Sequence, residues 1–117
     1  MSADRWSALL AEVTGIAGVR AAVVVAAEDG LVVHEAAMDE LPTDDLAALA
    51  SSVVRRAGEL LAALGNDRLR LCTLVAERGT VVAAQGAQGL WLVALADPDT
   101  ELGRLRLQLG DLAPEFA

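Results

Sequence analysis

The 117-residue sequence has no lysine, one histidine and one cysteine, and these scarcities exclude several kinds of site. Without lysine there is neither a Walker A phosphate-binding loop nor a Schiff-base nucleophile. Any nucleophile–histidine site would have to use His34, and one histidine with one cysteine gives no zinc-ligand spacing. The single cysteine, Cys72, also excludes an internal disulfide. We therefore expect no catalytic residue, no metal and no cofactor, and a protein that is not an enzyme.

Long hydrophobic runs and clustered positive charge are also missing. The longest apolar runs, such as 21–27, are far shorter than the roughly 20 residues that span a bilayer. The N-terminus is amphipathic and charged early, unlike a signal peptide. The net charge is −8 and the nine basic residues, all arginine, are scattered along the chain, which disfavours binding to phosphate backbones. We expect a cytoplasmic protein with no membrane insertion and no nucleic-acid partner.

Apolar residues are abundant instead. They make up 55% of the chain, and the mean hydropathy is +0.45, which is more apolar surface than a small monomer easily buries. The length suits one domain, 1–117, with a real core. The surplus favours an oligomer.

The stretch 43–65 predicts one long helix, around which the rest of the chain is organised. Asp44 and Asp45 complement the positive end of the helix dipole, and this explains them better than a metal or acid–base site. Thr43 is a candidate N-cap, with Pro42 as an alternative first helical residue, and Gly65 is a candidate stop. One apolar stripe at helical spacing is predicted to face the core: Leu46, Leu49, Ala50, Val53, Ala57, Leu60 and Leu64.

A second, smaller stripe runs beside the first along the same helix. Gly58 lies within this second stripe and costs roughly 1 kcal/mol relative to alanine, which indicates that another backbone approaches closely. We interpret the stripe as the interface of a homodimer with antiparallel long helices; the alternative is an ordinary alanine-rich surface helix. The predicted interface residues are Ala47, Ser51, Val54, Gly58, Leu61 and Ala62.

The remaining segments predict a five-stranded sheet. Helical patterns occupy 3–15 and the region after Thr100, and strand patterns occupy 19–27, 31–36, 69–77, 80–85 and 90–96. A type I′ hairpin is expected at Asp29-Gly30. The first and fifth strands are apolar runs without polar alternation, so they should be central, with the more polar second and third strands at the edges. This gives strand order 2-1-5-4-3, antiparallel, in an α/β (α+β) sandwich with the long helix on one face and two helices on the other.

The order of these features resembles the roadblock/light-chain-7 family, which has a profilin-like fold and includes dynein light chains and the bacterial GTPase regulator MglB. The resemblance covers nearly the whole chain, although each motif alone is weak. Alanines replace the proline and the glycine that the family often has at Ala17 and Ala21. The matching stretches are 16–19 with 22–25, 29–33, 46–50 and 102–106.

This resemblance implies a dimer joined through the long helix and the third strand, and a partner that is a small Ras-like GTPase whose GTP hydrolysis the protein regulates. It places that partner near the paired helices, where the charged residues Arg55, Arg56 and Glu59 point away from the core stripe; the alternative is that they are solvated surface charges. Two other functions stay open. One is a structural adaptor without a GTPase, and the other is a small-molecule sensor, which the lack of converging polar groups disfavours.

The single residues that could take part in catalysis or in ligand or partner binding all have ordinary structural interpretations. We expect His34 to be half-exposed on an edge strand, and Cys72 to be a small core residue. Trp91 is predicted to lie in the core, and core packing is favoured for Trp6 over a role as surface anchor. The glycine-rich stretch 86–89 is predicted to be a turn, because no helix start follows it.

Overall fold

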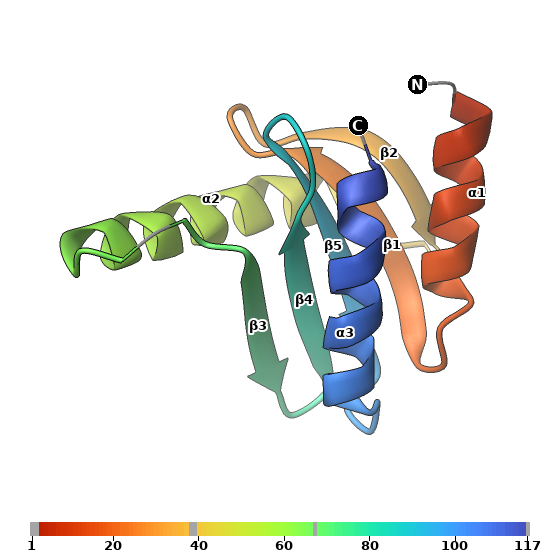
Figure 1. Ribbon diagram of the computed structural model, residues 1–117. Coiled ribbons are helices and arrows are strands. Elements are labelled where there is room, and N and C mark those ends of the chain that lie inside the picture. The colour runs from red at the N-terminus through yellow and green to blue at the C-terminus, as the bar shows by residue number, and fades with distance from the viewer. Residues whose placement is uncertain (1–2, 38–39, 67, 117) are drawn as a thin grey trace.

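The computed structural model describes residues 3–37, 40–66 and 68–116, and it contains a five-stranded antiparallel sheet (Figure 1). The strand order β2-β1-β5-β4-β3 confirms the predicted order. The apolar strands β1 and β5 pair with each other at the centre, from Val19 opposite Ala96 to Ala26 opposite Leu90. The strands are β1 (Val19–Ala26), β2 (Leu31–Ala37), β3 (Leu71–Ala76), β4 (Gly79–Gln85) and β5 (Leu90–Ala96).

Helices cover both faces of the sheet, as predicted. On one face, α1 (Ala3–Thr14) and α3 (Leu102–Leu112) bury Leu10, Val13, Leu105 and Leu109 in one core cluster. A short 3-10 turn, Ala113–Glu115, follows α3. On the other face, α2 (Thr43–Ala63) covers a second cluster that includes Val23, Val93 and Trp91. The C-terminal half of α2 extends beyond the sheet (Figure 1).

The C-terminal end of α2 forms as predicted, whereas its N-terminal end differs from the prediction. Gly65 ends α2 with a φ of +76°, and the Gly65 and Asn66 N–H groups donate to the Ala62 and Leu61 carbonyls, which is a Schellman motif. Thr43 is the first helical residue rather than the N-cap, and Pro42 holds the cap position without a side-chain cap bond.

The hairpin between β1 and β2 forms where it was predicted, but it is not a type I′ turn. Its loop has four residues, 27–30, and of Asp29 and Gly30 only Gly30 has a positive φ, at 72°. The Gly30 N–H donates to the Ala26 carbonyl at 2.9 Å, and the Leu31 N–H donates to Asp29 Oδ1 at 3.1 Å. The aspartate thus stabilises the turn with its side chain instead of adopting a left-handed backbone.

Candidate interaction surface

Small residues form the side of α2 that faces the sheet. Ala47 is fully buried, Ser51 is 2% exposed and Val54 is 6% exposed. The helix approaches the hairpin closely, because a Cβ added at Gly30 would lie 3.3 Å from the Ala48 Cα. Larger side chains at these positions would push the helix away from β1 and β2, so the small stripe serves helix–sheet packing.

The predicted sidedness of α2 was therefore wrong. Ala47, Ser51 and Val54 were assigned to the dimer interface, yet each is buried within one protomer and has almost no surface left for a second copy. The close approach inferred from Gly58 concerns a second copy and stays a prediction; within the described chain nothing lies within 4 Å of a Cβ added there. Of the other two residues assigned to the interface, Leu61 is half-buried and Ala62 is exposed.

The predicted core stripe is divided. Leu46 and Ala50 pack against the α2-side cluster, as predicted, but the other members lie largely at the surface. Leu49, Leu60 and Leu64 are 67%, 61% and 67% exposed, and Val53 and Ala57 are half-buried. We name Leu49, Val53, Ala57, Leu60 and Leu64 together the leucine stripe. Its leucines project from one side of α2, and the opposite side carries Ala47 and Ser51, which are buried against the sheet. Such an apolar row on an ordered helix is typical of a surface that another molecule covers.

The edge strand β3 continues this apolar exposure. β3 pairs with β4 on one side only, so its other edge is open within the described chain. Leu74 and Val75 are 48% and 70% exposed. Leu74 pairs with Val81, which packs on the α2-side cluster, so Leu74 lies on the same face of the sheet as α2. An open, apolar strand edge is a template for pairing with another strand.

The charged residues predicted to contact a partner all lie at the surface of α2. Arg55, Arg56 and Glu59 are exposed, as expected. Arg56 Nη1 and Glu59 Oε2 form an ion pair at 3.2 Å, one turn apart and well exposed. Arg55 Nε donates to the Ser51 carbonyl at 3.4 Å. An exposed ion pair of this kind contributes little to stability.

The fold and this surface can now be compared with known proteins. The family model of the roadblock/LC7 domain matches residues 7–96. This chain belongs to the roadblock/LC7 family. A comparison with curated protein sequences finds no significant match.

Solved structures share the whole roadblock fold at low sequence identity. Myxococcus xanthus MglB superposes with a TM-score of 0.88 at 20% identity, covering 98% of this chain and 94% of that one. The gliding protein MglB of Thermus thermophilus gives 0.80 at 23% identity, with the same two coverages. A roadblock/LC7 domain from Streptomyces avermitilis gives 0.83 at 20%, covering 92% and 90%.

Other residues singled out in the sequence have structural positions in this roadblock domain. Trp91 is buried, at 8% exposed, and Cys72 is half-buried beside the α2-side cluster. His34 is half-buried on the edge strand β2, where its Nε2 lies 3.0 Å from Ser7 Oγ. Trp6 packs against the α1–α3 core, and its ring centroid is 6.3 Å from those of His34 and Phe116. These positions fit the ordinary interpretations.

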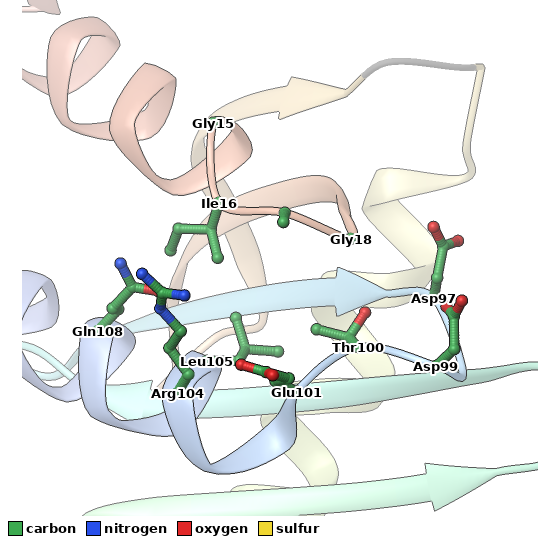
Figure 2. A pocket seen from close by; sticks show the side chains of 11 residues that line it. Gly15, Ile16, Gly18, Asp97, Asp99, Thr100, Glu101, Arg104, Leu105 and Gln108 are labelled. Atoms are coloured by element: carbon green, nitrogen blue, oxygen red, sulfur yellow. The ribbon is translucent and has the colours of Figure 1, made fainter.

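A hollow with mixed charge opens where the α1–β1 and β5–α3 loops meet (Figure 2). Asp97 and Asp99 lie at one end, and Arg104 with Gln108 at the other (Figure 2). Thr100 closes the floor so tightly that a Cβ at Gly18 would collide with its side chain. Asp97 already pairs with Arg20 at 3.7 Å. Because both acidic and basic side chains line this hollow, its charge does not favour any one class of ligand.

In a second hollow the charged residues that the structure describes are all basic, and no motif or charge run in the sequence pointed to it. Arg68 and Arg70 precede β3, while Arg106 comes from α3, and all three line the same hollow beside the β4–β5 turn. Arg68 and Arg70 line the same hollow as Arg106 only because α3 packs on the sheet. Among the described residues there is no cluster of metal-ligating side chains, and no helix is long and apolar enough to cross a membrane.

Proposed function

We propose that the protein is a non-catalytic homodimer that docks and regulates a small Ras-like GTPase. The observation that supports the dimer is the leucine stripe of α2 beside the open edge of β3. Together they expose at least five large apolar side chains: Leu49, Leu60, Leu64, Leu74 and Val75. A second copy that packs its α2 against this stripe and its β3 against this edge would bury both at once, and one two-fold axis suffices for the two contacts.

The β3 edge is self-complementary in a particular register. A two-fold axis perpendicular to the sheet keeps both α2 helices on the same face, and it requires one residue of β3 to lie opposite its own copy. If that residue is Thr73, Leu71 pairs with the partner's Val75 and Cys72 with the partner's Leu74. The neighbouring choice, Leu74, would instead place Leu71 opposite the partner's Glu77. Apolar side chains directly opposite one another stabilise a strand pair, so we propose the pairing centred on Thr73.

The GTPase part of the proposal rests on family membership and on the likeness to MglB proteins. Arg55, Arg56 and Glu59 are exposed on α2, where they can meet a partner that docks on the paired helices. Charges at the rim of an interface mainly set the association rate and the specificity. Since no residue resembles an arginine finger by motif, any stimulation of hydrolysis would come from repositioning the GTPase's own residues.

The test measures the binding of a Ras-like GTPase from the same organism, loaded with GDP or with a GTP analogue, and then GTP hydrolysis with and without this protein. Reversing Arg55 and Arg56 to glutamate should weaken binding about tenfold or more while leaving the thermal unfolding unchanged. The control reverses Arg104, which is exposed on α3 at the other face of the sheet.

Each outcome has a separate meaning for the proposal. Equal affinity in R55E/R56E and in wild type would move the docking site off this part of α2. A single arginine-to-alanine variant that binds normally but loses all stimulation would show an arginine finger in place of repositioning. Absence of binding in both nucleotide states would overturn the GTPase proposal and favour a structural adaptor built on the same dimer.

A further inference from the structure

The basic hollow lies where the segment before β3, the β4–β5 turn and the C-terminal part of α3 meet. It has a volume of about 660 Å³, which is within the range of roughly 300–1,000 Å³ that small-molecule sites occupy. Its charged lining residues are Arg68, Arg70 and Arg106, and the polar residues Gln85 and Gln88 also line it. The hollow is thus large enough for a ligand and rich in hydrogen-bond donors.

The charge balance of this hollow is opposite to that of the chain. The protein carries 17 acidic residues and a net charge of −8, yet none of the described residues that line the hollow is acidic. Arg68 has another interaction in the structure, whereas Arg70 and Arg106 form no ion pair with any described residue. Two guanidinium groups that line one hollow without a counter-ion among the described residues repel each other, and an anion bound between them would offset that repulsion.

The donors of the hollow select an anion with several oxygens. A guanidinium presents five N–H donors in a planar fork, which matches carboxylate or phosphate oxygens two at a time. The backbone adds donors at the 86–89 turn, because no backbone carbonyl of the described chain accepts from the N–H groups of Ala87, Gln88 or Gly89. The arginines belong to different elements, so a carboxylate with two oxygens does not satisfy them all, whereas linked phosphate groups offer enough oxygens for each.

We propose that this hollow is a binding site for a ligand with two or more phosphate groups, held by Arg70 and Arg106 from opposite sides and by the β4–β5 turn. The predicted turn at 86–89 is confirmed, and it carries no helix dipole of the kind that a P-loop uses. Affinity at this site comes from charge-assisted hydrogen bonds to the arginines. A free phosphorylated molecule and a phosphorylated lipid headgroup share this chemistry.

The experiment uses the full chain in its native oligomeric state and inorganic triphosphate as the probe, with calorimetry at near-physiological ionic strength. The variant Arg70→Gln/Arg106→Gln is expected to lower the affinity at least about tenfold. The control Arg78→Gln removes an exposed arginine from the turn after β3, outside the hollow, and should bind as wild type. A second arm replaces the probe by vesicles that carry phosphoinositide headgroups, with neutral phosphatidylcholine vesicles as reference.

Binding of triphosphate that depends on Arg70 and Arg106 would support the proposal with a free ligand. Binding to phosphoinositide vesicles alone, with the same dependence, would support it with a lipid headgroup. The proposal is overturned if neither probe binds, if Arg78→Gln weakens binding as much as the double variant does, or if a glutamate-rich peptide binds more tightly than triphosphate. The proposed Thr73 pairing places Glu77 of a second copy opposite Leu69, between Arg68 and Arg70. The proposal is therefore also overturned if triphosphate binds to Glu77→Gln but not to wild type, because that carboxylate would then fill the hollow.

Discussion

Replacing Leu60 and Leu64 together by alanine is expected to separate the dimer while leaving the protomer folded. The two side chains are 61% and 67% exposed in the protomer, so their loss should cost the isolated fold less than about 1 kcal/mol. A leucine-to-alanine change costs roughly 2 kcal/mol when the side chain is fully buried. If the interface covers all of the exposed surface, four truncated side chains per dimer remove about 5 kcal/mol; if it covers half, they remove about 2.5 kcal/mol.

These energies correspond to an increase in the dimer dissociation constant of between about 70-fold and about 5,000-fold. Sedimentation equilibrium over a dilution series measures that constant directly. The matched control is Leu107→Ala, because Leu107 on α3 is 67% exposed, as Leu64 is, but lies on another helix. A dissociation constant that is unchanged in the double variant, or raised equally by Leu107→Ala, would refute the assignment of the leucine stripe to the interface.

Three further substitutions test the corrected sidedness of α2 and its end. Val54→Glu places a carboxylate at a site that is 6% exposed, so it should destabilise the protomer by several kcal/mol, seen as loss of the folded circular dichroism signal; a folded monomer would contradict this. Gly58→Ala should raise the free energy of unfolding by roughly 0.5–1 kcal/mol in chemical denaturation, because nothing lies within 4 Å of the new Cβ; a weakened dimer would instead restore the predicted close contact. Gly65→Ala should lower that free energy by about 1 kcal/mol, because its φ is +76°, and an unchanged value would argue against the helix stop.

The sheet could be predicted from the sequence because its strands differ in polarity. Apart from Arg20 near the start of β1, β1 and β5 are apolar on both faces, whereas β2 carries His34 and Glu35. Their central and edge positions therefore follow from burial. Strands β1 and β2 form a hairpin, and β3, β4 and β5 form a meander. Only one strand order places the apolar strands of these two units side by side. The hairpin type was missed because Asp29 can support a turn through its side chain, and that option looks the same in sequence as a left-handed backbone.

The face of α2 that meets the sheet could not be read in the same way. Both stripes have helical spacing, and periodicity shows that a face is apolar without showing what covers it. The stripe with the larger side chains was predicted to face the core. The distance between helix and sheet, however, determines which stripe faces the sheet. Here Ala48 and Ser51 lie against Gly30, and that close approach leaves room for small side chains only.

The basic hollow shows a different limit of sequence reasoning. The arginines are scattered along the chain, so the sequence predicts no extended basic patch. Arg70 and Arg106 line one hollow because α3 covers the face of the sheet on which Leu71, the first residue of β3, also packs, a relation that depends on the tertiary fold. A local cluster can therefore reverse the sign of the charge without any trace in the overall composition.

The placement of residues on α2 has a consequence for the domain as a whole. A monomer gains most by burying its leucines and exposing its alanines, since burial of a leucine side chain contributes roughly 1.5–3 kcal/mol. This helix does the reverse, with Ala47 buried and Leu49, Leu60 and Leu64 exposed. The small stripe lets α2 lie close to the sheet, and the hydrophobic energy of its leucines is available only to a second molecule. The surplus of apolar residues in the composition thus has a definite location, and the same surface that weakens the isolated protomer is the one that a dimer would use.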